Sequence, residues 1–305
     1  MIISEQFALL PNNIRLHYAS KGEQGKPLLL FLHGFPEAWF AWQAQLEKFG
    51  GEFFAVAPDL RGYNLSSKPV GVDQYRPKLL MQDVALFIEH LGYEKACIVA
   101  HDWGGAVAWN LAIMQPQWVE KLIIINSPHP YLFMRELRKN PAQQRASAYM
   151  NWLRQEGSEN TLSKDNFKLL ENFFQHSDGR KPGWYTPQLQ ALYHAAWNIP
   201  GQQQSHALSG GINYYRASPL HPPLKDEPKS EAIELKPEDW QVQVPTCVIW
   251  GEQDMALLID LLRDLNTVVQ NLNIKPIPEG THWVVHEYPQ LVNEYIQQYL
   301  TQIAL

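Results

Sequence analysis

The sequence has little cysteine and no concentration of positive charge. Two of its 305 residues are cysteines, Cys97 and Cys247, and each lies inside an apolar run. We therefore interpret them as small buried residues in a reducing compartment and not as metal ligands. Lysine and arginine number 25 against 31 aspartates and glutamates, without a basic run, so the electrostatic signature of nucleic-acid binding is missing. These features predict no metal site and no nucleic-acid partner, and nothing in the chain indicates a cofactor.

The chain also lacks a long apolar stretch and a signal peptide. No segment approaches the ~18 consecutive apolar residues that a transmembrane helix needs, and residues 1–6 lack a basic region followed by an apolar one. We therefore predict that the protein has no membrane span and is cytoplasmic. With 45% hydrophobic and 18% charged residues, the composition is typical of a globular chain with a packed core.

Six short apolar runs carry the strand signal. They cover residues 27–32, 53–57, 96–100, 122–126, 246–250 and 274–278, and continuous runs of this length are typical of strands covered on both faces. Residues 78–91 have helical periodicity between the second and third runs, which is the pattern of a βαβ unit. Residues 291–300 form an amphipathic helix pattern. The fold class is therefore α/β, with a mostly parallel central sheet covered by helices on both faces.

The rhythm of the sequence changes after Pro128 and Pro130. Polar helical patterns rich in Gln and Asn, with scattered aromatics, replace the alternation of strands and helices. We predict an α/β core of residues 1–128 and 221–305 and an inserted helical cap (lid) of residues 129–220. Residues 218–245 contain six prolines and mixed charge, which predicts a connection that returns over the surface.

Asp102 is the candidate nucleophile. It follows the apolar run 96–100 and precedes a helical pattern, in His101-Asp102-Trp103-Gly104, with small residues two positions to either side. This is the spacing of a nucleophile elbow, in which the central side chain sits on a strained strand-to-helix turn and bulky neighbours would clash. An aspartate there attacks carbon directly and leaves an ester that water must hydrolyse. An ordinary serine esterase is excluded because no serine occupies the elbow.

Two further residues complete a predicted catalytic triad. His282 follows the last apolar run and Asp254 follows the run before it. His282 would deprotonate the hydrolytic water, and Asp254 would fix the imidazole tautomer and stabilise the imidazolium. Asp254 is also a candidate N-cap, because a helical pattern begins at Met255. His101 is interpreted as structural, since the residue before the nucleophile on an elbow points away from it.

Backbone N–H groups are expected to form an oxyanion hole. The tetrahedral intermediate of ester hydrolysis carries a negative oxygen that such donors must meet. Phe35 follows the first apolar run and is placed to supply one N–H. Trp103, one residue past the nucleophile, is the second predicted donor.

Two of these motifs resemble the epoxide hydrolase branch of the α/β-hydrolase superfamily, and the resemblance covers nearly the whole chain. They are His33-Gly34-Phe35-Pro36-Glu37, followed by Trp39, and His101-Asp102-Trp103-Gly104. The order of nucleophile, acid and histidine is also the α/β-hydrolase order. The resemblance implies an α/β-hydrolase fold with an inserted cap, in an enzyme that opens an epoxide to a vicinal diol. Haloalkane and haloacetate dehalogenases are close relatives of that branch.

The resemblance further implies two cap tyrosines that hydrogen-bond the epoxide oxygen and stabilise the developing alkoxide. Asn213-Tyr214-Tyr215-Arg216 resembles the second tyrosine motif, which gives this role to Tyr215. Residues 149–154 match the first motif loosely, so Tyr149 is the second candidate and Trp152 an alternative contact. Tyr149 is equally well explained as an aromatic on the packed face of a helix. Phenols with a pKa of ~10 suit the role because they donate without competing as bases.

The predicted pocket is apolar and aromatic. Its predicted substrate contacts are His33, Pro36, Trp103, Trp152 and Trp283, and His33 is also interpreted as a brace for the oxyanion loop. The predicted partners are a small apolar epoxide or halogenated substrate and water, and a homodimer is left open.

Two other functions compete with epoxide opening. A dehalogenase uses the same triad but must bind a halide, for which the indole N–H groups of Trp103 and Trp152 are candidates. Haloalkane dehalogenases usually have Asn or Glu in place of Phe35 and do not need Tyr215. Fluoroacetate dehalogenases bind the substrate carboxylate with arginines where this chain has Trp103 and Ala106. A non-catalytic, hydrolase-like binding protein would be expected to lose a member of the triad.

Overall fold

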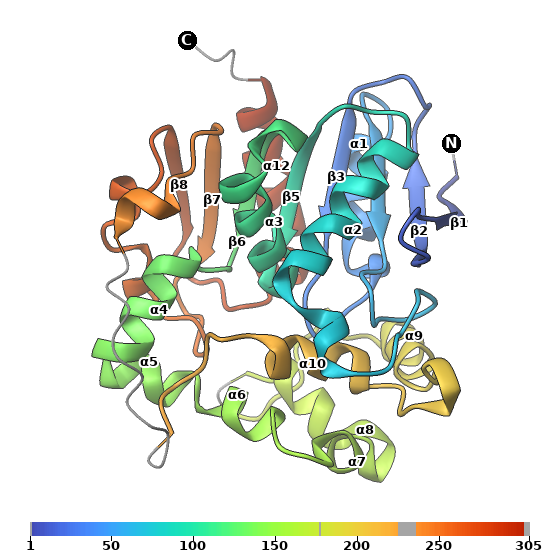
Figure 1. Cartoon of the computed structure of the whole chain (residues 1–305), viewed down its shortest axis with the longest axis vertical. Coiled ribbons are helices and arrows are strands. Elements are labelled where there is room, and N and C mark those ends of the chain that lie inside the picture. The colour runs from blue at the N-terminus through green and yellow to red at the C-terminus, as the bar shows by residue number, and fades with distance from the viewer. Residues whose placement is uncertain (1, 177, 225–235, 302–305) are drawn as a thin grey trace.

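An eight-stranded sheet forms the centre of the molecule. The computed structural model describes residues 2–176, 178–224 and 236–301 (Figure 1). The strand order is β1-β2-β4-β3-β5-β6-β7-β8. The strands are β1 (Ser4–Leu9), β2 (Arg15–Lys21), β3 (Leu28–Leu32), β4 (Phe54–Pro58), β5 (Ala96–His101), β6 (Val119–Ile125), β7 (Thr246–Gly251) and β8 (Leu272–Ile277). All six predicted strands are present, with ends shifted by at most three residues.

The sheet is mostly parallel, as predicted. The strands from β3 to β8 pair in parallel with their neighbours, whereas β2 pairs antiparallel with both β1 and β4. The sequence does not predict β1 and β2. Five of the six residues of β1 are exposed, and β2 mixes charged and polar residues with apolar ones, so neither strand forms an apolar run.

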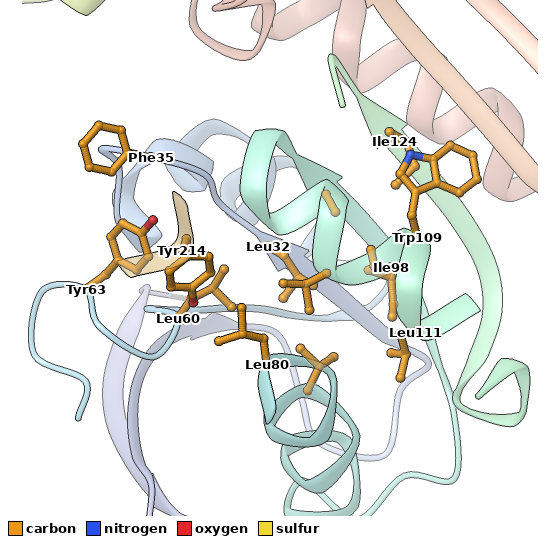
Figure 2. Packing of buried hydrophobic residues seen from close by; sticks show 14 of the residues in the cluster. Leu32, Phe35, Leu60, Tyr63, Leu80, Ile98, Trp109, Leu111, Ile124 and Tyr214 are labelled. Carbon is orange, nitrogen blue, oxygen red and sulfur yellow. The ribbon is translucent and has the colours of Figure 1, made fainter. Parts of the chain in front are cut away.

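Alternate residues of each strand face two separate layers of the core. In β5, Ile98 belongs to the layer that contains α2 (Pro77–His90) and α3 (Asp102–Met114). Its neighbour Val99 belongs to the layer that contains α1 (Gln43–Phe49) and α12 (Pro289–Thr301). Figure 2 shows Ile98 beside Leu111 of α3 in the first layer. Each such side chain stabilises the fold by roughly 1.5–3 kcal/mol of free energy when it leaves water. Cys97 and Cys247 form no disulfide and are buried in the second layer.

Helices occupy the segment between β6 and β7. They are α4 (Pro130–Lys139), α5 (Pro141–Ala146), α6 (Ala148–Leu153), α7 (Ser158–Leu162), α8 (Lys164–Glu171), α9 (Pro187–Trp197) and α10 (Ser209–Ala217). Figure 1 shows them gathered at one end of the sheet, away from the helices that cover its faces. The remaining helix is α11 (Val284–Glu287), and 3₁₀ turns lie at Trp39–Trp42, Val72–Tyr75, Pro116–Trp118, Asn172–Phe174, Gln202–Gln204, Pro237–Trp240, Ile259–Leu262 and Leu265–Thr267. The boundaries of the predicted core and cap stay a prediction.

The prediction of a helix that begins at Met255 is wrong. A bend occupies residues 255–257, and a 3₁₀ turn begins only at Ile259. The N–H groups of Ala256 and Leu257 are bound by the Asp254 side chain, each at 2.9 Å. The next N–H, that of Leu258, donates to the side chain of Gln143 from α5 at 3.0 Å. Side-chain acceptors therefore replace the backbone carbonyls that a helix would use.

Two other predictions concern the whole chain. None of the helices in the described ranges has both the length and the apolar character needed to traverse a bilayer, and the cytoplasmic location stays a prediction. The predicted surface connection 218–245 falls partly on residues 225–235, which lie outside the described residues.

Helix α3 approaches β3 so closely that only glycine fits at its third residue. A Cβ atom on Gly104 would lie 2.3 Å from the carbonyl oxygen of Leu32 and 2.5 Å from that of His33. Both oxygens belong to the backbone and cannot rotate away. The small residue that the elbow pattern requires after Asp102 is therefore a packing requirement between α3 and the end of β3.

We expect Gly104→Ala to lower the free energy of unfolding by about 1–3 kcal/mol or more, because the added methyl forces the helix away from the strand. Urea denaturation measures this loss. Gly51→Ala is the matched control, since its Cβ would meet nothing within 4 Å, and its stability should stay within about 0.5 kcal/mol of the wild type. Equal stabilities of the two variants would contradict the close packing.

Candidate active site

Asp102 lies at a tight turn between β5 and α3. Its φ angle is +48°, in the left-handed region that L-residues rarely adopt, and a strained backbone of this kind is typical of functional sites. A Cβ on Gly34 would lie 2.3 Å from the Cβ of Asp102, so the facing loop must carry glycine. The Ser127 hydroxyl donates to the Asp102 carbonyl oxygen at 2.7 Å and holds the turn from β6. The chain thus presents the carboxylate on a bend, as the sequence pattern indicates.

The two oxygens of the Asp102 carboxylate have different surroundings. The Phe35 N–H donates to Oδ1 at 2.7 Å, whereas Oδ2 lies 3.6 Å from Nε2 of His282. Trp103 is the second residue of α3, and the first N–H groups of a helix have no partner within the helix. Both predicted oxyanion donors therefore flank the nucleophile, and the participation of Trp103 stays a prediction.

His282 is fixed between two carboxylates. Its Nδ1 lies 2.7 Å from Oδ2 of Asp254, which leaves Nε2 directed at Asp102. The loop between β8 and α11 that carries His282 is tied down by Glu287, which accepts both the N–H and the hydroxyl of Thr281 at 2.8 Å. His101, at the end of β5, also holds this loop, because its Nε2 lies 2.9 Å from the His282 carbonyl oxygen.

Asp254 is buried and bound by four groups. The side chain of Asn126 donates to Oδ2 at 2.9 Å, beside the bond to His282, while the N–H groups of Ala256 and Leu257 donate to Oδ1. Burial by itself would raise the pKa of Asp254, but the charge of His282 and these hydrogen bonds outweigh it and hold the pKa below its ordinary value. Asp254 is therefore ionised. It binds backbone N–H groups as an N-cap would and orients the histidine as well.

The charge of its neighbours makes His282 basic. Burial alone would lower its pKa, but the charge and hydrogen bond of Asp254, with the charge of Asp102, raise the pKa to about 9. The imidazole is thus protonated at neutral pH as long as both carboxylates are charged.

Tyr149 and Tyr215 lie together over the nucleophile. Their rings are 6.1 Å apart, and the Tyr215 ring packs edge-on against Trp103 at 4.9 Å and Phe35 at 5.3 Å. Burial, followed by the charge of Asp102, raises the pKa of Tyr149 above its ordinary value. Burial, with the neighbouring Tyr149 and then Asp102, does the same for Tyr215. Both phenols therefore stay protonated and are able to donate.

Two cavities meet at these residues, since Asp102, Tyr149 and Tyr215 line both. The first has a volume of about 870 Å³ and mostly apolar walls, which include Phe133, Met134, Met150, Leu220, Trp240 and Leu257. The second has about 1230 Å³ and is bordered by His282 and by the polar residues Asn172, Gln175, His176, Gln253 and Thr281. Among the described residues that line the two cavities there is no Lys or Arg. No group of three or more His, Cys, Asp and Glu side chains in the described ranges is arranged to hold a metal ion.

The predicted substrate contacts divide into two sets. Trp103 lines the first cavity and Trp283 the second, whereas His33, Pro36 and Trp152 line neither. His33 is fully buried; it accepts the N–H of Leu60 at 3.0 Å through Nε2, so its Nδ1 donates to the Gly34 carbonyl at 2.8 Å. Burial lowers its pKa. His33 thus links Leu60 to the loop that begins at Gly34, and its role as a brace for an oxyanion loop stays a prediction.

Pro36 and Trp152 have other surroundings. The Pro36 carbonyl accepts the indole N–H of Trp197 at 2.7 Å, and Pro36 borders a separate cavity of about 300 Å³. Trp152 is partly buried against the main hydrophobic core. Helix α6 therefore turns Tyr149, and not Trp152, toward the nucleophile.

Sequence reasoning missed two polar residues that organise the site. Asn126 accepts the N–H of Gly251 at 2.8 Å and donates to Asp254, so it joins the ends of β6 and β7. A signal was present, because Asn126 is the polar residue that ends a predicted strand. Glu37 is buried, and its Oε1 atom lies 2.6 Å from Nε2 of His286 and accepts a hydrogen bond from the Tyr193 hydroxyl at 2.9 Å. No sequence pattern indicated that α9 and α11 would bring these partners to it.

Comparisons with known proteins agree with one another. A family model described as the α/β-hydrolase fold matches residues 27–289. Epoxide hydrolase 4 of Mus musculus is 35% identical over 296 residues, which cover 95% of this chain and 77% of that protein. AB hydrolase superfamily protein YfhM of Bacillus subtilis (strain 168) is 36% identical over 291 residues and 95% of both chains. A crystal structure of Bacillus megaterium epoxide hydrolase in complex with an inhibitor has a TM-score of 0.84 and 34% identity, with 97% of this chain and 100% of that chain covered.

We expect the imidazole of His282 to titrate near pH 9 in the wild type. In Asp254→Asn its pKa should fall by about 1–3 units, because the strongest positive influence is lost while burial remains. Imidazole ¹⁵N NMR across a pH series measures both values. Glu252→Gln, which neutralises an exposed carboxylate in the same loop, should leave the titration unchanged. A pKa that does not move in Asp254→Asn would contradict the electrostatic account.

Proposed function

Since the chain belongs to the α/β-hydrolase family and is an enzyme of the epoxide hydrolase type, we propose that it opens an epoxide to a vicinal diol through a covalent ester on Asp102. The convergence of three kinds of group on one carboxylate carries this proposal. Asp102 receives the Phe35 N–H, faces the imidazole of His282, and lines the same cavities as Tyr149 and Tyr215. The cap, residues 129–220, contributes the tyrosines, and the core, residues 1–128 and 221–305, contributes the triad.

In the first step the Oδ2 atom of Asp102 attacks a ring carbon of the epoxide. A new bond forms between that oxygen and the carbon, and the bond from the carbon to the epoxide oxygen breaks. The bonding electrons pass to the epoxide oxygen, where the hydroxyls of Tyr149 and Tyr215 stabilise the alkoxide and supply its proton. The tyrosinate left behind regains a proton, by way of solvent, from the imidazolium of His282, whose pKa falls once the ester has removed the charge of Asp102. Oδ1 stays on the Phe35 N–H and becomes the carbonyl oxygen of the ester.

In the second step His282 activates water. The ester at Asp102 carries no charge, so the pKa of His282 falls from its resting value and the imidazole becomes a base. It removes a proton from water, and the hydroxide attacks the ester carbonyl carbon. The oxyanion on Oδ1 is held by the N–H groups of Phe35 and Trp103. The bond from the carbonyl carbon to the substrate oxygen then breaks, and that oxygen takes the remaining proton of the added water, so that the diol leaves. Asp102 is again a carboxylate, now with one oxygen from water, and His282 is again protonated.

The lining of the cavities favours an uncharged, apolar substrate. The first cavity offers a wide apolar wall, and no Lys or Arg is among the described residues that line either cavity. A haloacid would therefore lack the arginine partners that its charge requires. A haloalkane would fit the walls, but a halide leaves as a stable anion and does not need the proton that a phenol supplies to an alkoxide. A non-catalytic binding protein is disfavoured because Asp102, Asp254 and His282 are all present and in contact.

Replacing His282 should trap the ester. We expect His282→Gln, mixed with styrene oxide, to accumulate a covalent adduct whose mass increase equals the whole epoxide, because ring opening expels no leaving group. Intact-protein mass spectrometry, with peptide mapping to Asp102, measures it. A haloalkane in the same assay would add only its alkyl group. An adduct formed from haloalkanes alone would instead support the dehalogenase.

Removing the Tyr215 hydroxyl should slow ring opening by at least about tenfold, since the alkoxide loses a donor. Diol formation by Tyr215→Phe measures the effect, and Tyr149→Phe is expected to act in the same direction. Tyr63→Phe is the matched control, because the buried Tyr63 hydroxyl has no hydrogen-bond partner within the described residues. Full activity in Tyr215→Phe would remove the tyrosine from the mechanism.

A further inference from the structure

The two tyrosines come from two short helices whose ends lie together. Tyr149 is on α6 (Ala148–Leu153) and Tyr215 is on α10 (Ser209–Ala217), and the two helices are in contact. An arginine lies near the C-terminal end of each helix: Arg154 is the C-cap residue of α6, and Arg216 lies in the last turn of α10. Neither arginine lines the two cavities at Asp102.

Each arginine binds the carbonyl groups that end the other helix. Nη1 of Arg154 donates to the carbonyl oxygens of Tyr215 at 3.0 Å and Ser218 at 2.8 Å. In return, Arg216 donates to the carbonyl oxygens of Arg154 at 3.3 Å and Gln155 at 2.8 Å. The last carbonyls of a helix lack partners within it and carry partial negative charge, so a guanidinium there satisfies both needs. The exchange is reciprocal and links the two helices at their ends.

A buried carboxylate fixes Arg216 in this position. Both oxygens of Glu159, on α7, accept from the guanidinium, at 2.5 and 2.9 Å. Glu159 also accepts the hydroxyl of Ser209, at the start of α10, at 3.1 Å. Burial by itself would raise the pKa of Glu159, but the hydrogen bonds from Arg216 outweigh it and hold the pKa below its ordinary value. The pair is therefore charged and bidentate, which is the strong form of this contact.

From this geometry we propose that Arg154 and Arg216 are positioning residues that hold the Tyr149 and Tyr215 hydroxyls at the separation needed to meet one epoxide oxygen. The inference rests on the proposed function. Arg154 acts directly on the main chain of Tyr215, and Arg216 acts on the end of the helix that carries Tyr149. Two donors on separate helices converge on one atom only if the helices keep a fixed relation, and small displacements of reacting groups cost large factors in rate.

The test separates the two chemical steps by single-turnover rapid quench. We expect Arg154→Ala to slow formation of the alkyl-enzyme at least about tenfold and to leave hydrolysis of the ester unchanged, because the second step does not use the tyrosines. Arg135→Ala is the control: this arginine of α4 pairs with Glu136 and Asp264 and does not touch α6 or α10 within the described contacts. It should change neither rate.

Conservative substitutions sharpen the test. Arg154 uses a single nitrogen for both carbonyls, so Arg154→Lys should restore most of the alkylation rate. Arg216 uses two nitrogens to bind Glu159, and a lysine has only one, so Arg216→Lys should itself slow alkylation. Thermal melting of each variant identifies any that fails to fold. If Arg154→Ala is one of them, Arg216→Lys replaces it as the weakened variant, and Arg154→Lys is its folded reference.

A variant cycle asks whether the arginine acts through the phenols. In a Tyr149→Phe, Tyr215→Phe background, Arg154→Ala should have no further effect on alkylation. Equal slowing of both steps, or an undiminished effect in that background, would overturn the positioning role. A wild type that alkylates while Arg154→Ala alkylates at the same rate overturns only this role, whereas a wild type that forms no alkyl-enzyme overturns the proposed function with it.

Discussion

The site depends on a carboxylate that the main chain holds in a strained turn. At Asp102 the backbone has a positive φ angle, and the glycines at positions 34 and 104 are there because a Cβ atom at either one would collide with the turn or with β3. Because the turn is held in this way, Oδ1 of Asp102 accepts the Phe35 N–H and Oδ2 faces His282 without any movement of the side chain. The parallel sheet contributes by bringing the ends of β3, β5, β7 and β8 to one edge, where the carboxyl ends of its strands meet.

The same carboxylate also contributes, after Asp254, to the charge state of His282. While Asp102 and Asp254 are both ionised, His282 binds a proton tightly. In the proposed mechanism, formation of the ester removes one of these charges at the moment when a base is needed. Asp254 keeps its own charge throughout because Asn126 and two backbone N–H groups compensate for its burial. One histidine can therefore rest as a cation and act as a base in the next step.

Most of the fold could be predicted because buried parallel strands consist of continuous apolar runs. The triad could be predicted because its residues directly follow those runs. The edge strand β1 could not, since its residues are exposed and carry no such pattern. The turn after Asp254 was mistaken for a helix because its acceptors are side chains, one of them Gln143, more than a hundred residues away. The choice between Tyr149 and Trp152 was equally hidden, because the packing of α6 on distant helices decides which of its faces meets the cavity. Long-range side-chain contacts are what a pattern of neighbours in sequence cannot report.

The most direct measurement of the central claim is a single turnover of the wild type in H₂¹⁸O, followed by mass analysis of the peptide that contains Asp102. The mechanism predicts one ¹⁸O atom in the Asp102 carboxylate and none in the diol formed in that first turnover, since the water oxygen enters the protein and the diol takes its second oxygen from Asp102. Label found directly in the diol, with an unlabelled Asp102, would mean that water attacks the epoxide itself and that no covalent ester forms.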